Sequence, residues 1–148
     1  VTRDGHEWPP NVNDPQTFCL TTANGVCYLG GDGRINAYPI LTVLHILFLR
    51  EHNRIADELF KINPHWNDEK LFQEARKIAN AEYQQIFYYD LLPLILGEAN
   101  VRNAKIIYRG EGSQTYDDYD PNVRGCTDNE HTTSAYRHFH SLVADSAQ

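Results

Sequence analysis

The chain has 148 residues, enough for one domain or for a piece of a larger one. Its net charge of −7 argues against nucleic acid and anionic membrane surfaces as partners, because both are themselves negatively charged. The longest apolar run, Ile40 to Leu49, is about half the length that a bilayer span needs, so no membrane span is predicted. Because the chain starts at Val1 and contains no methionine, we expect a processed or excised segment.

Three cysteines give an odd count. Cys19 and Cys27 flank the turn residues Asn24 and Gly25, a spacing that allows a small disulfide-closed loop and would then indicate an oxidising compartment. A reduced pair is equally compatible with the sequence. Cys126 is left over, either free or paired with a segment outside this chain.

The first 38 residues carry little periodicity. Residues 1–18 contain three prolines and are predicted to be an irregular surface segment with Trp8 as its large apolar anchor. Residues 19–38 join the cysteine loop to a glycine-rich turn, which indicates positive φ angles or a close backbone approach. The turn lacks the Gly-Lys-Ser/Thr of a phosphate loop, so a nucleotide site is not expected.

The remaining pattern is mainly α-helical with irregular loops. A first helix is predicted from Pro39 to Lys61, since proline is tolerated in a first turn and Asn63 precedes a second proline. Its first half is almost wholly apolar, so we expect it to be the buried central helix of the core. Arg54 and Glu58 have the spacing of an i,i+4 ion pair.

A second helix is predicted over 67–91. Asn67 is a good N-cap, and the acidic residues that follow it complement the helix dipole. Pro93 should kink or restart the helix, and Gly97 is a typical C′ residue.

Residues 98–127 are loop-rich, and a last helix is predicted over 128–143. The loop contains a cluster of possible calcium ligands: Asp117, Asp118, Asp120 and Asn122. Neither the central glycine nor the closing glutamate of an EF-hand loop is in place, so a solvated acidic turn is favoured.

The last helix carries the first candidate site. Arg137 and His140 lie three residues apart and share a helix face, whereas His138 and His140 lie on different faces. An imidazole with a guanidinium one turn earlier suits an anionic cofactor, because the imidazole can bind a metal while the guanidinium pairs with a carboxylate. A histidine with a purely structural role explains the same pattern.

Two further groups of charges stand out. Arg34 lies on the glycine turn, where a fixed cation could stabilise developing negative charge, although an ordinary turn arginine looks the same in sequence. The cluster from Arg50 to Arg54 directly follows the apolar run. A structural charge network is the favoured interpretation of this cluster, with an active site as the alternative.

Taken together, these stretches resemble the animal haem peroxidases, the group of peroxidasin, myeloperoxidase and thyroid peroxidase. The resemblance covers roughly Cys19 to Val143 and rests on several motifs in series. The matching runs are GDGRIN at 31–36, LREHNRI at 49–55, NPHW at 63–66, QEARKI at 73–78 and LPLILG at 92–97.

The resemblance implies a role for each candidate residue. Arg34 matches the distal-side arginine that acts with a distal histidine on hydrogen peroxide. His140 matches the proximal histidine that ligates the haem iron, and Arg137 matches the arginine that pairs with a haem propionate. The implied activity is reduction of hydrogen peroxide with oxidation of a small electron donor, a halide or a phenol, by a b-type or modified haem in a secreted protein.

The resemblance also implies that residues 1–148 are a partial haem peroxidase domain, with 1–18 an irregular N-terminal segment and 19–148 the family-like core. The family's distal histidine and calcium site would lie upstream of this chain, and the asparagine that supports the proximal histidine would lie downstream. Other chains of the same processed peroxidase are therefore expected partners.

Two departures from the family pattern keep an alternative open. Ala37 replaces a glutamate that can esterify the haem, so that covalent link is impossible here. Phe139 replaces the glycine before the proximal histidine, and His138 replaces an aromatic residue. These changes are compatible with a haem-less, peroxidase-like structural or adhesive extracellular protein.

Overall fold

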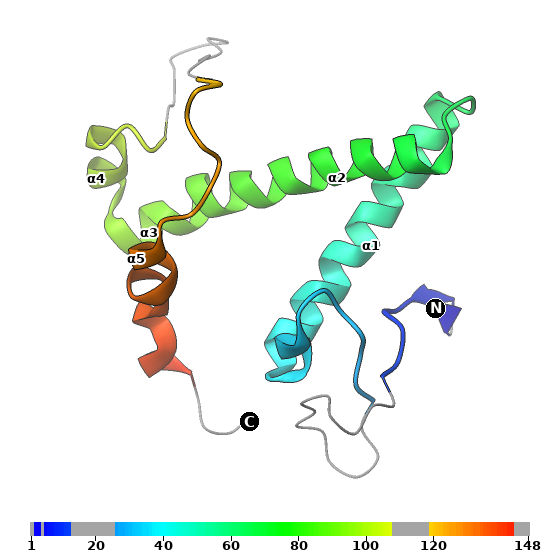
Figure 1. The fold of residues 1–148 in the computed structure, drawn as a ribbon, viewed down its shortest axis with the longest axis horizontal. Coiled ribbons are helices and arrows are strands. Elements are labelled where there is room, and N and C mark those ends of the chain that lie inside the picture. Colours follow the sequence, from blue (N-terminus) through cyan, green and yellow to red (C-terminus); the bar gives the residue numbers. More distant parts are fainter. Residues whose placement is uncertain (1, 4, 13–25, 108–118, 144–148) are drawn as a thin grey trace. The chain divides into compact units, whose positions relative to one another are not determined.

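The computed structural model describes residues 2–3, 5–12, 26–107 and 119–143, and it divides the chain into two compact units (Figure 1). The first unit is Val1–Ile107 and the second is Tyr108–Gln148. Helices make up almost all of the regular structure in the described ranges, which confirms the mainly α fold.

The N-terminal segment contains more regular structure than its sequence predicts. Strands β1 (Thr2–Arg3) and β2 (His6–Glu7) form an antiparallel pair. The chain then runs beside the residues around Cys27, where the Val12 amide donates to the Cys27 carbonyl at 2.9 Å. Cys27 is buried and disulfide-bonded, whereas Cys126 is free and exposed. Cys19 lies outside the described residues, so its pairing with Cys27 stays a prediction.

Helix α1 (Pro39–Ile62) confirms the first predicted helix. Pro39 lies in its first turn, where the missing N–H costs nothing because no intrahelical acceptor is available there. The helix ends at Asn63, whose amide donates to the Leu59 carbonyl at 2.8 Å. The short 3-10 helix η1 (Gly33–Asn36) precedes it, and the Thr42 hydroxyl donates to the Ile35 carbonyl at 2.6 Å.

The expectation that α1 is the buried central helix is wrong for this chain. Only Ile46 and Ile55 are buried on α1. Five large apolar residues of its first half are between 40% and 61% exposed: Ile40, Leu41, Val43, Leu44 and Leu47. The reason is geometric: a helix that is apolar all round needs neighbours on several sides, and in the described residues α1 packs chiefly on α2 and η1.

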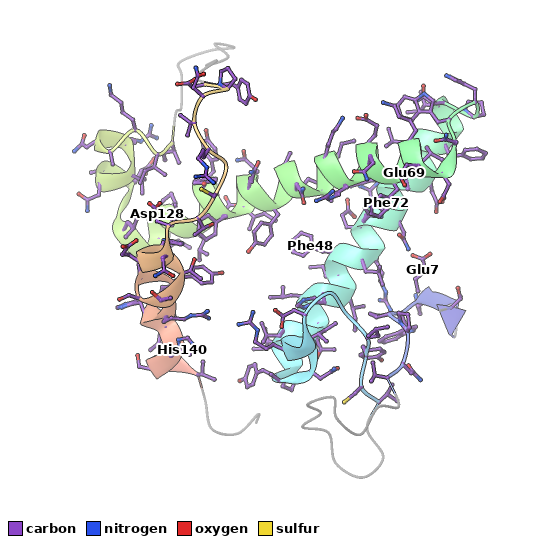
Figure 2. All side chains as sticks on the ribbon, in the orientation of Figure 1. Glu7, Phe48, Glu69, Phe72, Asp128 and His140 are labelled. Carbon is purple, nitrogen blue, oxygen red and sulfur yellow. The ribbon has the colours of Figure 1, made fainter. Side chains whose placement is uncertain are left out.

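Helix α2 (Asp68–Gln85) begins as the sequence predicts, because the Asn67 side chain accepts a hydrogen bond from the Lys70 amide at 2.9 Å. It packs on α1 partly through Phe48, whose ring lies edge-on to Tyr83 with centroids 5.3 Å apart (Figure 2).

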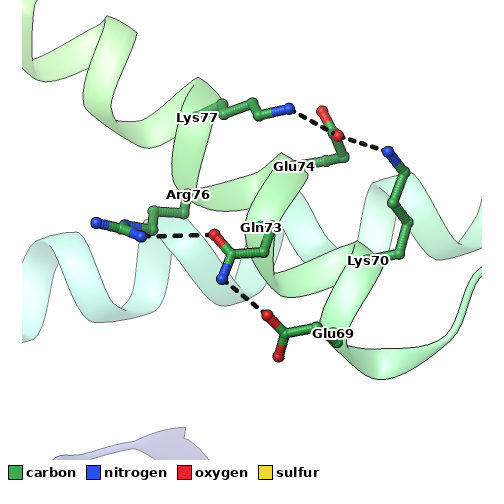
Figure 3. Close-up of polar contacts among 6 residues, drawn as sticks. All are labelled: Glu69, Lys70, Gln73, Glu74, Arg76 and Lys77. Carbon is green, nitrogen blue, oxygen red and sulfur yellow. Dashed lines mark hydrogen bonds and ion pairs between the residues drawn. The ribbon is translucent and has the colours of Figure 1, made fainter.

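The exposed face of α2 carries an ion-pair network (Figure 3). Glu74 accepts from Lys70 at 2.7 Å and from Lys77 at 2.9 Å. The hydrogen bond from Lys70, followed by that from Lys77, lowers the pKa of Glu74. Such exposed pairs contribute little to stability individually, so they support the helix without fixing its position.

After α2 the helix widens into the π-helical segment η2 (Ile86–Leu91) and restarts as α3 (Leu92–Leu96). The Leu92 amide donates to the Phe87 carbonyl, five residues earlier. Pro93 explains the change, because its ring displaces the carbonyl four residues before it. Gly97 has φ +84° and ends α3. The predicted restart at Pro93 and the predicted C′ position of Gly97 are therefore confirmed. Helix α4 (Glu98–Asn103) follows.

The second unit lacks the continuous α-helix predicted over 128–143. Helix α5 (Asn129–Thr133) stops at Ser134 and continues as the 3-10 helix η3 (Ala135–Leu142). The Thr133 hydroxyl donates to the Asn129 carbonyl at 2.7 Å, and such back-bonding disfavours a regular helix. Every described residue of this unit is exposed, so packing does not enforce α geometry there.

The predicted acidic turn is described only in part. The Asp120 carboxylate accepts from the backbone amide of Asn122 at 2.8 Å and is exposed to solvent. Asp117 and Asp118 lie outside the described residues.

Candidate functional site

Arg34 lies in the 3-10 turn η1, and its charge is already paired. Asp32 caps this turn by accepting from the Arg34 amide at 2.8 Å. The same carboxylate accepts from the Arg34 side chain, from Nε at 2.9 Å and from Nη2 at 2.6 Å. Asp32 is a functional neighbour that the predicted site residues do not include, although an aspartate two residues before an arginine at a turn is a usable signal.

This pairing shifts both groups toward their charged forms. The Arg34 side-chain hydrogen bond, followed by that from its amide, holds the pKa of Asp32 well below its usual range. The hydrogen bond to Asp32 raises the pKa of Arg34. Both side chains are largely exposed, so Arg34 is a surface cation whose Nε and Nη2 are bonded to Asp32.

Buried neighbours fix the position of this turn. Ile35 is 2% exposed, and a Cβ added at Gly30 would meet the Ile35 side chain at 2.8 Å. Asn36 is also buried and forms two hydrogen bonds to the backbone of Tyr28, one as acceptor at 2.8 Å and one as donor at 2.9 Å. The glycine turn therefore packs without space for a side chain at position 30.

The cluster from Arg50 to Arg54 holds the N-terminal segment against α1. The Arg50 Nε donates to the Glu7 carbonyl at 2.9 Å, and its guanidinium carbon lies 4.7 Å from the centre of the Trp8 ring. The Asn53 amide donates to the Glu7 carboxylate at 2.7 Å. These contacts are those of a structural network, the interpretation that the sequence favoured.

The ion pair predicted between Arg54 and Glu58 does not form. Arg54 donates to Glu51 one turn earlier, with Nε 2.9 Å from Oε2, and Glu58 pairs with Lys61 at 2.6 Å. In both pairs the acid precedes the base, an orientation that also favours the helix dipole.

His140 lies in η3 with its two ring nitrogens in different situations. Its Nδ1 is 2.8 Å from the carbonyl oxygen of Arg137. Because a carbonyl only accepts, Nδ1 carries the hydrogen, and in the neutral ring the lone pair is then on Nε2. Nε2 has no hydrogen-bond partner among the described residues. A histidine oriented in this way can ligate a metal through Nε2.

Arg137 and His140 share one edge of η3, because residues three apart eclipse in a 3-10 helix. The Arg137 guanidinium forms no ion pair within the part of the chain that the structure describes. His138 instead packs edge-on against Phe139, with ring centroids 5.0 Å apart. The structure thus places Arg137 and His140 together in the second unit, while Arg34 belongs to the first unit.

Comparison with known proteins shows to which family the chain belongs. The family model of the animal haem peroxidases matches residues 1–148. The chain belongs to the animal haem peroxidase family. It is 46% identical over 142 residues to a peroxidase of Drosophila melanogaster, covering 95% of this chain and 21% of that relative.

Other relatives of the peroxidase family give the same result. A chorion peroxidase of Aedes aegypti is 48% identical over 129 residues, which cover 86% of this chain and 16% of the relative. A human peroxidasin homolog is 42% identical over 146 residues, which cover 97% of this chain and 9% of the relative. The chain therefore spans only about a fifth or less of these peroxidases.

The donor atoms of the described residues fit a haem better than a bare metal ion. Within the described ranges, no three His, Cys, Asp or Glu side chains group closely enough to hold a metal by themselves. The His140 imidazole, whose Nε2 has no partner among the described residues, and Arg137, which forms no ion pair to them, would instead suit a haem, because its iron can take a histidine and its propionates can pair with an arginine. Among the described helices, none is long and apolar enough to cross a membrane.

Proposed function

We propose that this chain is part of a haem-dependent peroxidase that reduces hydrogen peroxide and oxidises a small donor, a halide or a phenol. Residues 1–148 then form a partial peroxidase domain, with 19–148 as its family-like core, around a b-type or modified haem. The observation that carries the proposal is the orientation of His140, whose Nδ1–H is held by the Arg137 carbonyl at 2.8 Å.

In this proposal His140 would ligate the haem iron through Nε2. The hydrogen bond to the carbonyl fixes the tautomer and increases the electron density that Nε2 donates. Arg137 follows the same edge of η3, so its guanidinium is available for a haem propionate without first breaking an ion pair to a described residue.

Following the family resemblance, we assign to Arg34 the role of a positive charge that acts on hydrogen peroxide. The Asp32 carboxylate accepts from two N–H groups of Arg34 and so neutralises part of the Arg34 charge. The same bonds hold the long side chain in one orientation, which lowers the entropy lost when it binds a ligand. The remaining N–H groups of Arg34 would be available to stabilise negative charge that develops on peroxide. When bound, haem supplies the redox centre that accepts the oxidising equivalents of peroxide and passes them to the donor.

A secreted location is part of the proposal. It is supported by the disulfide-bonded Cys27, since disulfides persist in oxidising compartments. Parts of the peroxidase beyond residues 1–148, such as other chains of the same processed protein, are proposed to supply the distal histidine and the calcium site that the family resemblance implies.

Haem titration of the purified protein, followed by the Soret band, tests the proposal. We expect His140→Ala to abolish haem retention, while Arg34→Ala retains haem and slows the reaction with hydrogen peroxide by about a hundredfold or more. His138→Ala is the matched control, because that imidazole packs on Phe139. Equal haem retention in the two histidine variants would refute the assignment of His140.

The same titration distinguishes the alternative function. Ala37 and Phe139 depart from the family pattern and favour a haem-less structural or adhesive protein. If the wild-type protein gives no Soret band with haem supplied, the peroxidase proposal fails and the alternative is supported.

A further inference from the structure

A pocket in the first unit lies between the N-terminal segment, the glycine turn and α1, and it does not include Arg34. Its volume is about 340 Å³, within the range of small-molecule sites. Apolar groups form most of its wall, among them Trp8, Pro9, Leu29 and Leu49.

The wall of this pocket is held in place by identifiable contacts. The Trp8 ring stacks on Tyr28 with centroids 5.9 Å apart and an interplanar angle of 10°, and the Arg50 guanidinium lies over the same ring. The Leu29 amide donates to the Pro10 carbonyl at 2.7 Å, which joins the two sides of the pocket. An apolar site with a fixed aromatic wall is suited to an aromatic ring.

Two side chains of the pocket wall, His45 and Glu7, carry acceptor atoms. His45 donates through Nδ1 to the Leu41 carbonyl at 2.7 Å, so the Nε2 of its neutral ring is an acceptor. Glu7 accepts from Asn53 through Oε2, and its Oε1 has no partner among the described residues. The Glu7 carboxylate forms no ion pair within the described ranges, whereas the Glu7 backbone carbonyl accepts from Arg50 at 2.9 Å; Figure 2 labels Glu7 on β2.

We propose that this pocket binds a small aromatic cation, a ring linked to a protonated amine, with the ammonium on the Glu7 carboxylate and the ring against Trp8. The acceptor His45 takes a further donor of the ligand, such as a phenol hydroxyl. An anionic ligand is disfavoured because it would meet both Glu7 and an acceptor nitrogen. The proposal does not depend on haem or on peroxidase chemistry.

Three probes with the same phenol ring test the charge requirement: tyramine, which is cationic, tyrosol, which is neutral, and 4-hydroxyphenylacetate, which is anionic. Binding is followed by Trp8 fluorescence in a Trp66→Phe background, since the chain has only these two tryptophans. We expect tyramine to bind with a Kd of about 0.1–1 mM and tyrosol about tenfold more weakly. Equal binding of the three probes, or no saturable binding of tyramine, would overturn the proposal.

Variants then test the assignment of Glu7. Glu7→Gln should weaken tyramine binding about tenfold and leave tyrosol binding unchanged, because only the charge is lost. The amide oxygen still accepts from Asn53 and the backbone carbonyl still accepts from Arg50, so the fold is retained, as circular dichroism checks. Glu58→Gln is the matched control, because Glu58 pairs with Lys61 away from the pocket. Equal effects of the two substitutions on tyramine would contradict the site.

Discussion

Asn36 provides the sharpest test of how the first unit holds its glycine turn. Its side chain accepts from the Tyr28 amide at 2.8 Å and donates to the Tyr28 carbonyl at 2.9 Å, and Asn36 is only 7% exposed. Asn36→Leu removes both bonds at once and leaves both backbone groups without their partner. The two lost hydrogen bonds and the two unsatisfied backbone groups together should lower the free energy of unfolding by about 2–4 kcal/mol.

Two measurements report this loss. Thermal unfolding should shift down by roughly 5–15 °C, from about 2–4 °C per kcal/mol for a chain of this size. Hydrogen exchange at the Tyr28 amide should speed up, because that N–H loses its acceptor. The matched control is Asn80→Leu, at an exposed position of α2, where we expect a change within about 0.5 kcal/mol.

The result that would refute the reasoning is specific. If Asn36→Leu and Asn80→Leu melt alike and the Tyr28 amide keeps its protection, the paired bonds of Asn36 do not hold the turn. Asn36→Asp separates the two bonds further, since it keeps an acceptor for the Tyr28 amide but places an oxygen against the Tyr28 carbonyl.

Three further predictions follow from local geometry. The folded pKa of the Asp32 carboxyl is depressed, so this group contributes stability above its unfolded pKa of about 3.9, and that contribution is lost as the pH falls below this value. Arg34→Lys should move the Asp32 pKa back toward the unfolded value, as an NMR titration of the variant measures. An unchanged Asp32 titration would contradict the pairing. Asn67→Ala should destabilise the protein by about 1 kcal/mol in chemical unfolding while Asn67→Ser stays close to wild type, because serine also caps; equal losses would exclude capping as the cause. Gly97→Ala should lower the free energy of unfolding by about 1 kcal/mol or more, because the φ angle of Gly97 is +84°. Gly125→Ala should be near neutral, because a Cβ added there meets open space, and similar unfolding midpoints for the two variants would refute the strain argument.

Features that depend on a few neighbouring residues were predictable from the sequence. The start of α2 at Asn67, the restart near Pro93 and the end of α3 at Gly97 each follow from one residue's capping, missing N–H or tolerance of positive φ. The shared edge of Arg137 and His140 was also predictable, because a spacing of three brings side chains together in an α-helix and in a 3-10 helix alike.

Other features depend on competition that the sequence pattern does not resolve. The ion pair of Arg54 with Glu51 instead of Glu58 is a choice between two acids of suitable spacing. The break at Ser134 arises where hydroxyl side chains compete for backbone carbonyls and no packed neighbour restores the helix.

The amino-acid sequence by itself determined α1, the start of α2, the restart near Pro93 and the family to which the chain belongs, because these depend on short-range chemistry and on motifs in series. Tertiary structure alone decided that the Arg50 guanidinium lies over Trp8 and that the apolar half of α1 is exposed. The physical reason is that partners distant in sequence, and the number of neighbours around a helix, are set by packing in three dimensions.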